Sequence, residues 1–258
     1  MTWKEIFSHT FKALRETQEP CPQAYFPDAA MVKSCRSDDS DFCQEVVARQ
    51  WLTEAQMQHA AEQYRLGRSR SGKTIFWMID EIGQVLDGHI GSSWVSQMLL
   101  QRHPDLLSGI PTVHCFFGEH LVTMGTGSQC AAMSKALHSG ACPQREQSAS
   151  KICLIESERS AVILSEIYPE YIWLAWVYDA NLTIDKLEPL SGHRVVLYPR
   201  ASEAKEDFTF CSEIASQARH LYNLDITVNN ILEHQASPEQ KARRIDLFEY
   251  ISEASTSL

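Results

Sequence analysis

Short apolar runs alternate with helix-forming stretches in the last hundred residues of the chain. These runs are four or five residues long and show no polar position at every second residue, a pattern that predicts strands covered on both faces, as in a parallel sheet. They occupy 152–155, 171–175 and 195–198. Ser157 can cap a helix after the first run, with Ala161, Leu164 and Ile167 on one face. This alternation of strand and helix predicts an open α/β sheet.

The pattern continues to the end of the chain. Apolar residues recur at three- and four-residue steps from 204 to 222, which predicts a helix lying on the sheet, and alternation over 224–228 predicts a further strand. Ser237 and Gln240 form a capping-box pattern ahead of a last helix that buries Ile245, Phe248 and Ile251.

The first half of the chain has a different pattern. Helical periodicity covers 3–14, 42–51 and 53–64, and two apolar runs at 74–79 and 84–90 predict a β-hairpin, followed by a short helix at 94–100. We therefore expect an N-terminal helical and hairpin region at 1–122, an inserted loop or linker at 123–150, and an α/β domain at 151–258 (fold class α/β, α+β overall).

Composition limits the classes of function. The 258 residues carry a formal net charge of −10, so any contact with nucleic acid must use a local basic patch rather than bulk charge. No apolar run approaches the roughly 20 residues that span a bilayer, and the N-terminus lacks the apolar core of a signal peptide. The eight cysteines include no C-x-x-C pair. We expect a cytoplasmic protein with buried thiols and no membrane contact.

The densest basic cluster surrounds a phosphate-loop pattern. Residues 67–74 match it letter for letter, but a helix precedes the match and a strand follows, the reverse of the strand-to-helix context in which such loops bind phosphates. This context favours a hairpin with a basic entry loop. The cluster consists of Arg65, Arg68, Arg70 and Lys73. Two interpretations of it stay open: a solvated basic loop, or a contact with the backbone of DNA or RNA.

Residues 155–161, Ile-Glu-Ser-Glu-Arg-Ser-Ala, resemble the first motif of the Toprim domain, the metal-binding α/β fold of bacterial primases, topoisomerases and related nucleases. More narrowly, the chain is similar to a poorly characterised family of Toprim-like, primase-related proteins encoded on bacterial mobile elements. Further short matches lie at 64–67, 75–80, 115–121, 171–175 and 195–199.

The resemblance implies a set of site residues and a cofactor. Glu156 corresponds to the catalytic acid or base and metal ligand, with Ser157 and Arg159 beside it. For Glu119 and His120 two interpretations stay open: burial beside Phe116 and Phe117 favours a structural role, while the resemblance, in which relatives carry the same pair, implies that they face the Glu156 site. Such a site binds Mg²⁺ through carboxylates.

The chain departs from the Toprim pattern at three points. Arg200-Ala201-Ser202 stands where an Asp-x-Asp pair is expected, Trp176-Val177-Tyr178 replaces a glycine-bearing turn, and the zinc ribbon that often precedes the domain in relatives is missing. A guanidinium at residue 200 should repel Mg²⁺ and pair with Glu156 instead. The expected cofactor is therefore none, or weakly bound Mg²⁺.

Three functions remain in view. We expect a nucleic-acid-associated accessory protein with a degenerate metal site, acting with replication proteins in mobile-element DNA replication or maintenance. One alternative is an active Mg²⁺-dependent primase or nuclease that uses Glu156 with displaced acids among Glu203, Glu206 and Asp207. The other alternative is a protein-interaction module that contacts no nucleic acid.

Overall fold

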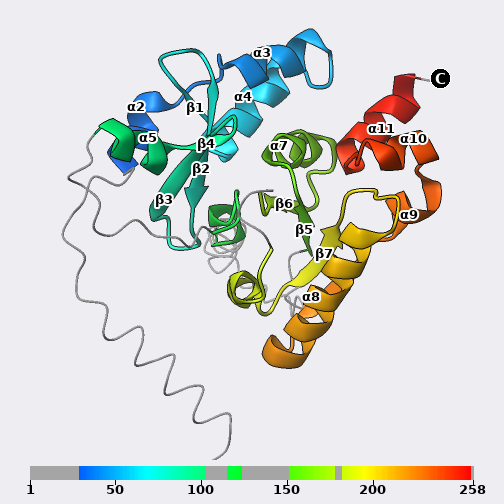
Figure 1. Cartoon of the computed structure of the whole chain (residues 1–258). Coiled ribbons are helices and arrows are strands. Elements are labelled where there is room, and N and C mark those ends of the chain that lie inside the picture. Colours follow the sequence, from blue (N-terminus) through cyan, green and yellow to red (C-terminus); the bar gives the residue numbers. More distant parts are fainter. Residues whose placement is uncertain (1–28, 103–114, 124–150, 178–181, 257–258) are drawn as a thin grey trace, which may run out of the picture.

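The computed structural model places the predicted apolar strands side by side in one parallel sheet (Figure 1). Its order is β6-β5-β7-β8, and Ile152 lies opposite both Ile172 and Val195. The prediction of parallel strands is confirmed. The bounds are β5 Lys151–Ile155, β6 Ile172–Ala175, β7 Arg194–Tyr198 and β8 Asp225–Val228.

The structure describes residues 29–102, 115–123, 151–177 and 182–256. The helix predicted at 3–14 and nearly all of the insertion predicted at 123–150 lie outside these ranges.

Helices cover both faces of the parallel sheet. Helix α7 (Glu158–Ile167) connects β5 to β6 on one face, while the 3₁₀ helix η4 (Asp185–Leu190) and helix α8 (Glu206–Tyr222) pack on the other. Along β5, Cys153 and Ile155 join the core on the α7 side, and Ile152 and Leu154 join the core on the α8 side. The strand has no solvent face, which explains why its sequence is apolar without alternation.

The first half of the chain forms an antiparallel sheet of order β1-β2-β3-β4. One face of β2 packs Phe76 and Met78 toward the α7 side, and the other face packs Ile75 and Trp77 in a separate cluster with residues of α2 and α5. The strands are β1 Gly67–Arg68, β2 Thr74–Ile79, β3 Val85–Ile90 and β4 Ser93–Trp94. The helices are α2 Ala29–Cys35, α3 Asp41–Ala48, α4 Glu54–Gln63 and α5 Val95–Arg102.

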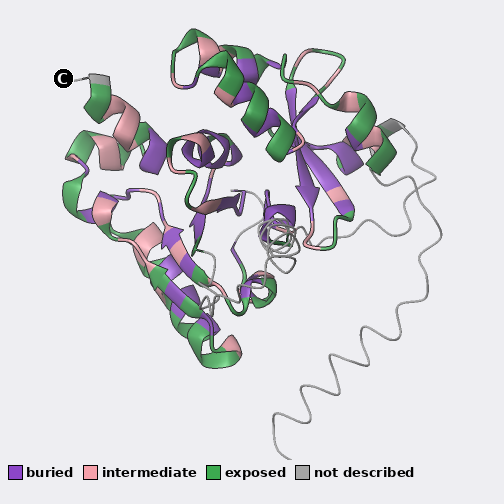
Figure 2. Ribbon diagram, turned by 180° about the vertical axis from the view of Figure 1, so that it is seen from behind, coloured by how far each residue is buried: buried purple, intermediate pink, exposed green. Residues whose placement is uncertain are grey.

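One continuous core lies between the two sheets. It contains buried residues of α3, α4, β2, β5, α7 and β6, and Figure 2 shows α7 and the strands around it as largely buried. Phe117 is at its centre: the ring stacks on Tyr64 at 5.1 Å, and the backbone pairs with Ala175 through two hydrogen bonds of 2.8 and 3.0 Å. The segment 115–123 thus covers the β6 edge of the parallel sheet.

The C-terminal residues cross the end of the parallel sheet. Helices α9 (Ile231–Gln235), α10 (Pro238–Ala242) and α11 (Leu247–Thr256) follow β8, and the predicted capping box of Ser237 and Gln240 is present. Leu232, Ala236 and Ile245 pack with Ala201 in a small core of their own. None of the helices in the described ranges is long and apolar enough to span a bilayer.

The turn after β6 keeps an unusual backbone. Val177, where the Toprim resemblance implies a glycine-bearing turn, has a φ of +49° and is buried. A β-branched residue rarely adopts this left-handed conformation, whereas glycine does so at little cost. The backbone of the turn is therefore of the glycine type although the side chain is valine.

Candidate functional site

The carboxyl edge of the parallel sheet has a topological switch point between β5 and β7. From β5 the chain continues to β6 on one side, and the following strand, β7, lies on the other side of β5. In open α/β sheets, ligands bind in the crevice outside the carboxyl ends of the strands at such a point. Glu156 follows directly after β5, and Arg200 lies two residues beyond β7. The topology therefore brings these two residues to the same edge.

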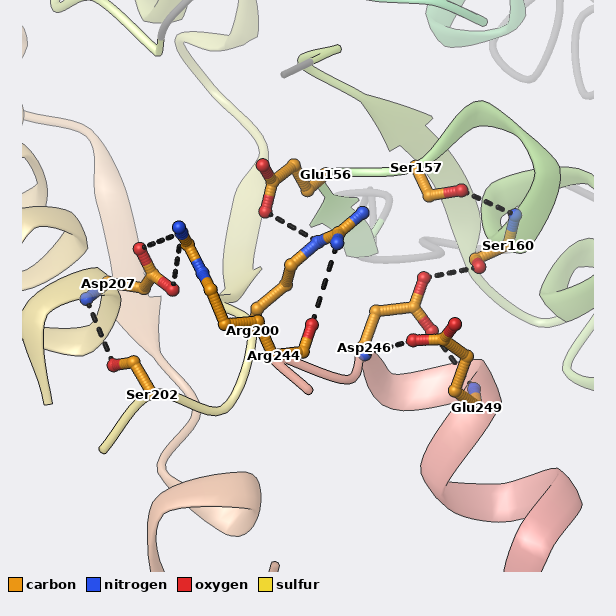
Figure 3. A network of polar contacts seen from close by, with 9 residues as sticks. All are labelled: Glu156, Ser157, Ser160, Arg200, Ser202, Asp207, Arg244, Asp246 and Glu249. Atoms are coloured by element: carbon orange, nitrogen blue, oxygen red, sulfur yellow. Dashed lines mark hydrogen bonds and ion pairs between the residues drawn. The ribbon is translucent and has the colours of Figure 1, made fainter. Parts of the chain in front are cut away.

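Glu156 and Arg200 form the ion pair expected from the sequence. The Nε atom of Arg200 lies 2.8 Å from Oε2 of Glu156, and the two side chains are 28% and 8% exposed (Figure 3). The buried Nε atom has no hydrogen-bond partner, because its N–H does not point at the carboxylate. Burial raises the pKa of Glu156 above 4.5, and the charge of Arg200 acts in the opposite direction. The contact is therefore electrostatic rather than a hydrogen bond.

A second arginine reaches the site from the C-terminal segment. The Nη2 atom of Arg244 lies 2.8 and 2.9 Å from the two carboxylate oxygens of Asp207, a residue in the first turn of α8. The backbone carbonyl of Arg244 accepts a hydrogen bond from Nη1 of Arg200 at 3.5 Å. The backbone N–H of Ala201 also donates to the carbonyl of Ile245 at 3.0 Å. The segment before α11 is thus tied to the residues that follow β7.

Asp246 connects the same segment to α7. Its carboxylate accepts a hydrogen bond from the hydroxyl of Ser160 at 2.5 Å and another from the backbone N–H of Glu249 at 2.9 Å. The carboxylate of Glu249 accepts from the N–H of Asp246 at 2.8 Å, which completes a capping arrangement at the start of α11 (Figure 3). The N-termini of α7 and α11 therefore meet at the site.

The carboxylates at this edge do not fit the Mg²⁺ ion that the resemblance implies. Mg²⁺ requires free oxygen ligands in octahedral geometry. Glu156 pairs with the guanidinium of Arg200, and both carboxylate oxygens of Asp207 contact Arg244. The carboxylate of Asp246 accepts hydrogen bonds from Ser160 and from the first turn of α11. Across the described ranges, no group of three or more His, Cys, Asp or Glu side chains is arranged to hold a metal ion.

Ser157 and Arg159 stabilise the motif helix. Ser157 is the N-cap of α7 and accepts a hydrogen bond from the backbone N–H of Ser160 at 3.4 Å, as predicted. Arg159 turns toward α3, where its Nη2 atom lies 2.5 Å from Glu45 and its guanidinium stacks over the ring of Phe42. Arg159 therefore attaches α7 to the first half of the chain and does not contact Glu156.

Glu119 and His120 lie elsewhere. Glu119 is buried and accepts a hydrogen bond from the backbone N–H of Phe116 at 2.9 Å. Burial, together with the carboxyl group of Glu81, raises its pKa to about 8. Burial lowers the pKa of His120 to about 4, and its Nε2 atom lies 3.1 Å from the carbonyl of Gln63. The structure does not bring this pair into contact with Glu156.

The basic residues 65–73 surround the loop 69–73 that joins β1 to β2; Arg65 precedes β1 and Arg68 is its last residue. The loop closes through a hydrogen bond from the N–H of Ser69 to the carbonyl of Lys73 at 2.8 Å, and helix α4 ends before it, so it is a hairpin turn and not a phosphate loop. Arg68, Arg70 and Lys73 are exposed, and Arg65 is half-buried. The hairpin expected from residues 74–79 and 84–90, with the basic loop at its entry, is present as β2 and β3; the pairing of β1 with β2 was not predicted.

Sequence reasoning missed Arg244 and Asp246, and it treated Asp207 as an exposed first-turn residue. Asp246 and Glu249 have the spacing of a capping box, so the start of α11 was recognisable. That signal predicts a helix terminus but not its position at the end of a sheet. The contact with α7 depends on packing between residues 86 positions apart.

Comparison with known proteins gives a short family match. A domain of unknown function (DUF6371) matches residues 139–201, which include β5, α7, β6, β7 and Arg200 but less than half of the chain. No curated protein matches. The primase fragment of the bacteriophage T7 primase-helicase protein is a similar solved structure, with a TM-score of 0.38 and 11% identity over 72% of this chain and 70% of that chain.

The fold class is as predicted: an α/β chain with a parallel four-stranded sheet flanked by helices, preceded by an antiparallel sheet.

Proposed function

We propose that this chain is a nucleic-acid-associated, Toprim-like protein in which an ion pair has replaced the catalytic metal. It acts as an accessory, with replication proteins as partners, in the replication or maintenance of mobile-element DNA. The observation that carries the proposal is the 2.8 Å contact between Glu156 and Arg200 at the switch point of the parallel sheet.

The charge of Arg200 supports the non-catalytic part of the proposal. Unit charges about 4 Å apart interact by about 4 kcal/mol at an effective dielectric constant near 20. The guanidinium therefore opposes a divalent cation beside Glu156 with an energy of this order. An arginine cannot lose its proton in a protein, so the opposition persists at every working pH.

The basic loop supports the nucleic-acid part. With a net charge of −10, the chain needs a local cluster of cations to approach a phosphate backbone. Arg68, the last residue of β1, is exposed together with Arg70 and Lys73 of the following turn, and hydrogen bonds hold this turn in place. There the carboxylate of Asp41 accepts hydrogen bonds from the N–H and the hydroxyl of Thr74 at 2.8 and 2.7 Å.

A salt titration of DNA and RNA binding tests the nucleic-acid contact. The logarithm of the affinity should fall linearly with the logarithm of the salt concentration. Replacing Arg68, Arg70 and Lys73 by alanine should weaken binding and reduce the slope by about 2 to 3, since each lost phosphate contact removes about 0.7–0.9.

A matched control removes the same charge elsewhere. Alanine at Arg49, Arg194 and Arg219, which are exposed on other elements, should leave affinity and slope almost unchanged. Absence of binding by the wild type at low salt would refute the nucleic-acid role and favour the protein-interaction module.

The catalytic alternative has its own test. We expect no Mg²⁺-dependent cleavage of DNA and no primer synthesis by the wild type, and no change in Glu156→Gln. Robust Mg²⁺-dependent activity that is abolished in Glu156→Gln would show that the site is catalytic and that the ion pair opens during turnover.

A further inference from the structure

Arg200 has more hydrogen-bond donors than it uses. A guanidinium carries five N–H donors. Nη1 donates to the carbonyl of Arg244 at 3.5 Å, the outer limit for such a bond, and Nε faces Glu156 without the direction of a hydrogen bond. Arg244, in contrast, contacts both oxygens of Asp207 at 2.8 and 2.9 Å. Arg200 therefore has unused donor capacity at this edge.

The position of Arg200 leaves part of its side chain accessible to a ligand, although Nε is buried. Its side chain is 28% exposed, and it stands at the switch point where ligands of open α/β sheets bind. The acidic groups nearest to it are already engaged. Asp207 is held by Arg244, and Asp246 is held by Ser160 and the start of α11.

We propose that Arg200 binds a phosphate group at the carboxyl edge of the parallel sheet, so that a fixed guanidinium does there what a metal ion would otherwise do. This site is distinct from the basic loop of residues 65–73, and it extends the proposed function without depending on nucleic-acid binding by that loop. The phosphate belongs either to a nucleic-acid backbone or to a small molecule such as a free phosphate or nucleotide.

The chemistry of the two groups favours this ligand. The planar guanidinium matches two phosphate oxygens in a bidentate manner, which a lysine cannot do. Glu156 is the competing anion. It contacts Arg200 through Nε, and Nη1 makes the long 3.5 Å bond to the carbonyl of Arg244, so Nη2 and this weakly bonded Nη1 remain for the ligand. A phosphate that approaches from solvent therefore pairs with the outer nitrogens while Glu156 keeps its contact with Nε.

The test titrates the full chain with inorganic phosphate and, separately, with a single-stranded oligonucleotide. The variants are Arg200→Gln and Arg200→Lys. Arg243→Gln is the control, because Arg243 is exposed and its guanidinium pairs with Glu253 rather than with Glu156. Calorimetry gives the affinities, and the NMR signal of the Arg200 Nε–H reports whether the ligand reaches this group.

Two results support the proposal and identify the source of the phosphate. In the first, inorganic phosphate binds the wild type and Arg243→Gln equally but Arg200→Gln about tenfold more weakly, a difference of about 1.4 kcal/mol. In the second, inorganic phosphate does not bind, yet Arg200→Gln lowers oligonucleotide affinity about tenfold and the salt slope by about one.

The proposal is overturned if Arg200→Gln leaves both titrations unchanged. Should Arg200→Gln fail to fold, Arg200→Lys decides the question. This variant keeps the positive charge but loses the bidentate geometry of the guanidinium. Weaker binding of phosphate or oligonucleotide by Arg200→Lys therefore supports the proposal, and unchanged binding overturns it. The basic-loop variant should bind inorganic phosphate like the wild type, which separates failure of this site from failure of the proposed function.

Discussion

Replacing Glu119 by glutamine should make the stability of the protein less dependent on pH. Glu119 is 3% exposed, and its pKa is raised from 4.5 to about 8 by burial and by the carboxyl group of Glu81. Between these values the folded protein holds a proton that the unfolded chain has released. The stability that this proton provides is fully present below pH 4.5 and is lost as pH rises through about 8.

The magnitude follows from the same two values. The difference between 4.5 and about 8, at about 1.4 kcal/mol for each pH unit, amounts to about 5 kcal/mol. We expect a measured effect between about 2 and 5 kcal/mol. The amide of Glu119→Gln keeps an acceptor for the N–H of Phe116 and a donor for Glu81, and it therefore imitates the protonated carboxyl group at every pH.

Urea unfolding at intervals between pH 5 and pH 9 measures the effect. The free energy of unfolding of the wild type should fall more steeply with pH than that of Glu119→Gln, and at pH 9 the variant should be the more stable protein. Glu203→Gln, which removes an exposed carboxylate, is the control and should follow the wild type. Parallel curves for wild type and Glu119→Gln would refute the assignment of a protonated, buried Glu119.

Three further outcomes follow from the geometry. Gly118→Ala should destabilise the fold by about 2 kcal/mol or more in urea unfolding, because its φ is +85° and an added Cβ would lie 2.9 Å from the ring of Tyr64; an unchanged midpoint would contradict this packing. Ser157→Ala should cost about 1 kcal/mol through loss of the α7 cap, with Ser157→Thr close to wild type. Arg200→Asp combined with Ser202→Asp should create a Mn²⁺ site beside Glu156, seen as paramagnetic broadening of nearby NMR signals that the wild type does not show.

The sequence was informative wherever a pattern was local. The run Ile152–Ile155 predicts β5, because a strand buried on both faces is apolar at every position. Ser157 predicts the start of α7, because the first backbone N–H groups of a helix need a side-chain acceptor. The basic loop was placed at the entry of a hairpin because the strand after it is rich in β-branched and aromatic residues. The pairing of Glu156 with Arg200 followed from charge at matching strand ends.

The rest of the site depends on long-range packing. Arg244 and Asp246 reach the sheet because three short helices cross its end, and no periodicity within residues 231–256 encodes that route. Glu119 was assigned to the Glu156 site by family resemblance, yet the bridge at Phe117 directs the following turn to Glu81. A motif shows which residue types are present but not which neighbour each one meets.

The bridge between Phe117 and Ala175 also limits how the chain can be divided. Phe117 precedes the predicted insertion but forms a bridge with Ala175 at the end of β6 in the sheet that follows it, and its side chain lies in the core between the halves. A fragment that began at residue 151 would expose the unpaired β6 edge, which invites pairing with other chains. Recombination of this parallel sheet with another partner region, in evolution or in the laboratory, would therefore have to carry residues 115–123 with it or supply an equivalent strand.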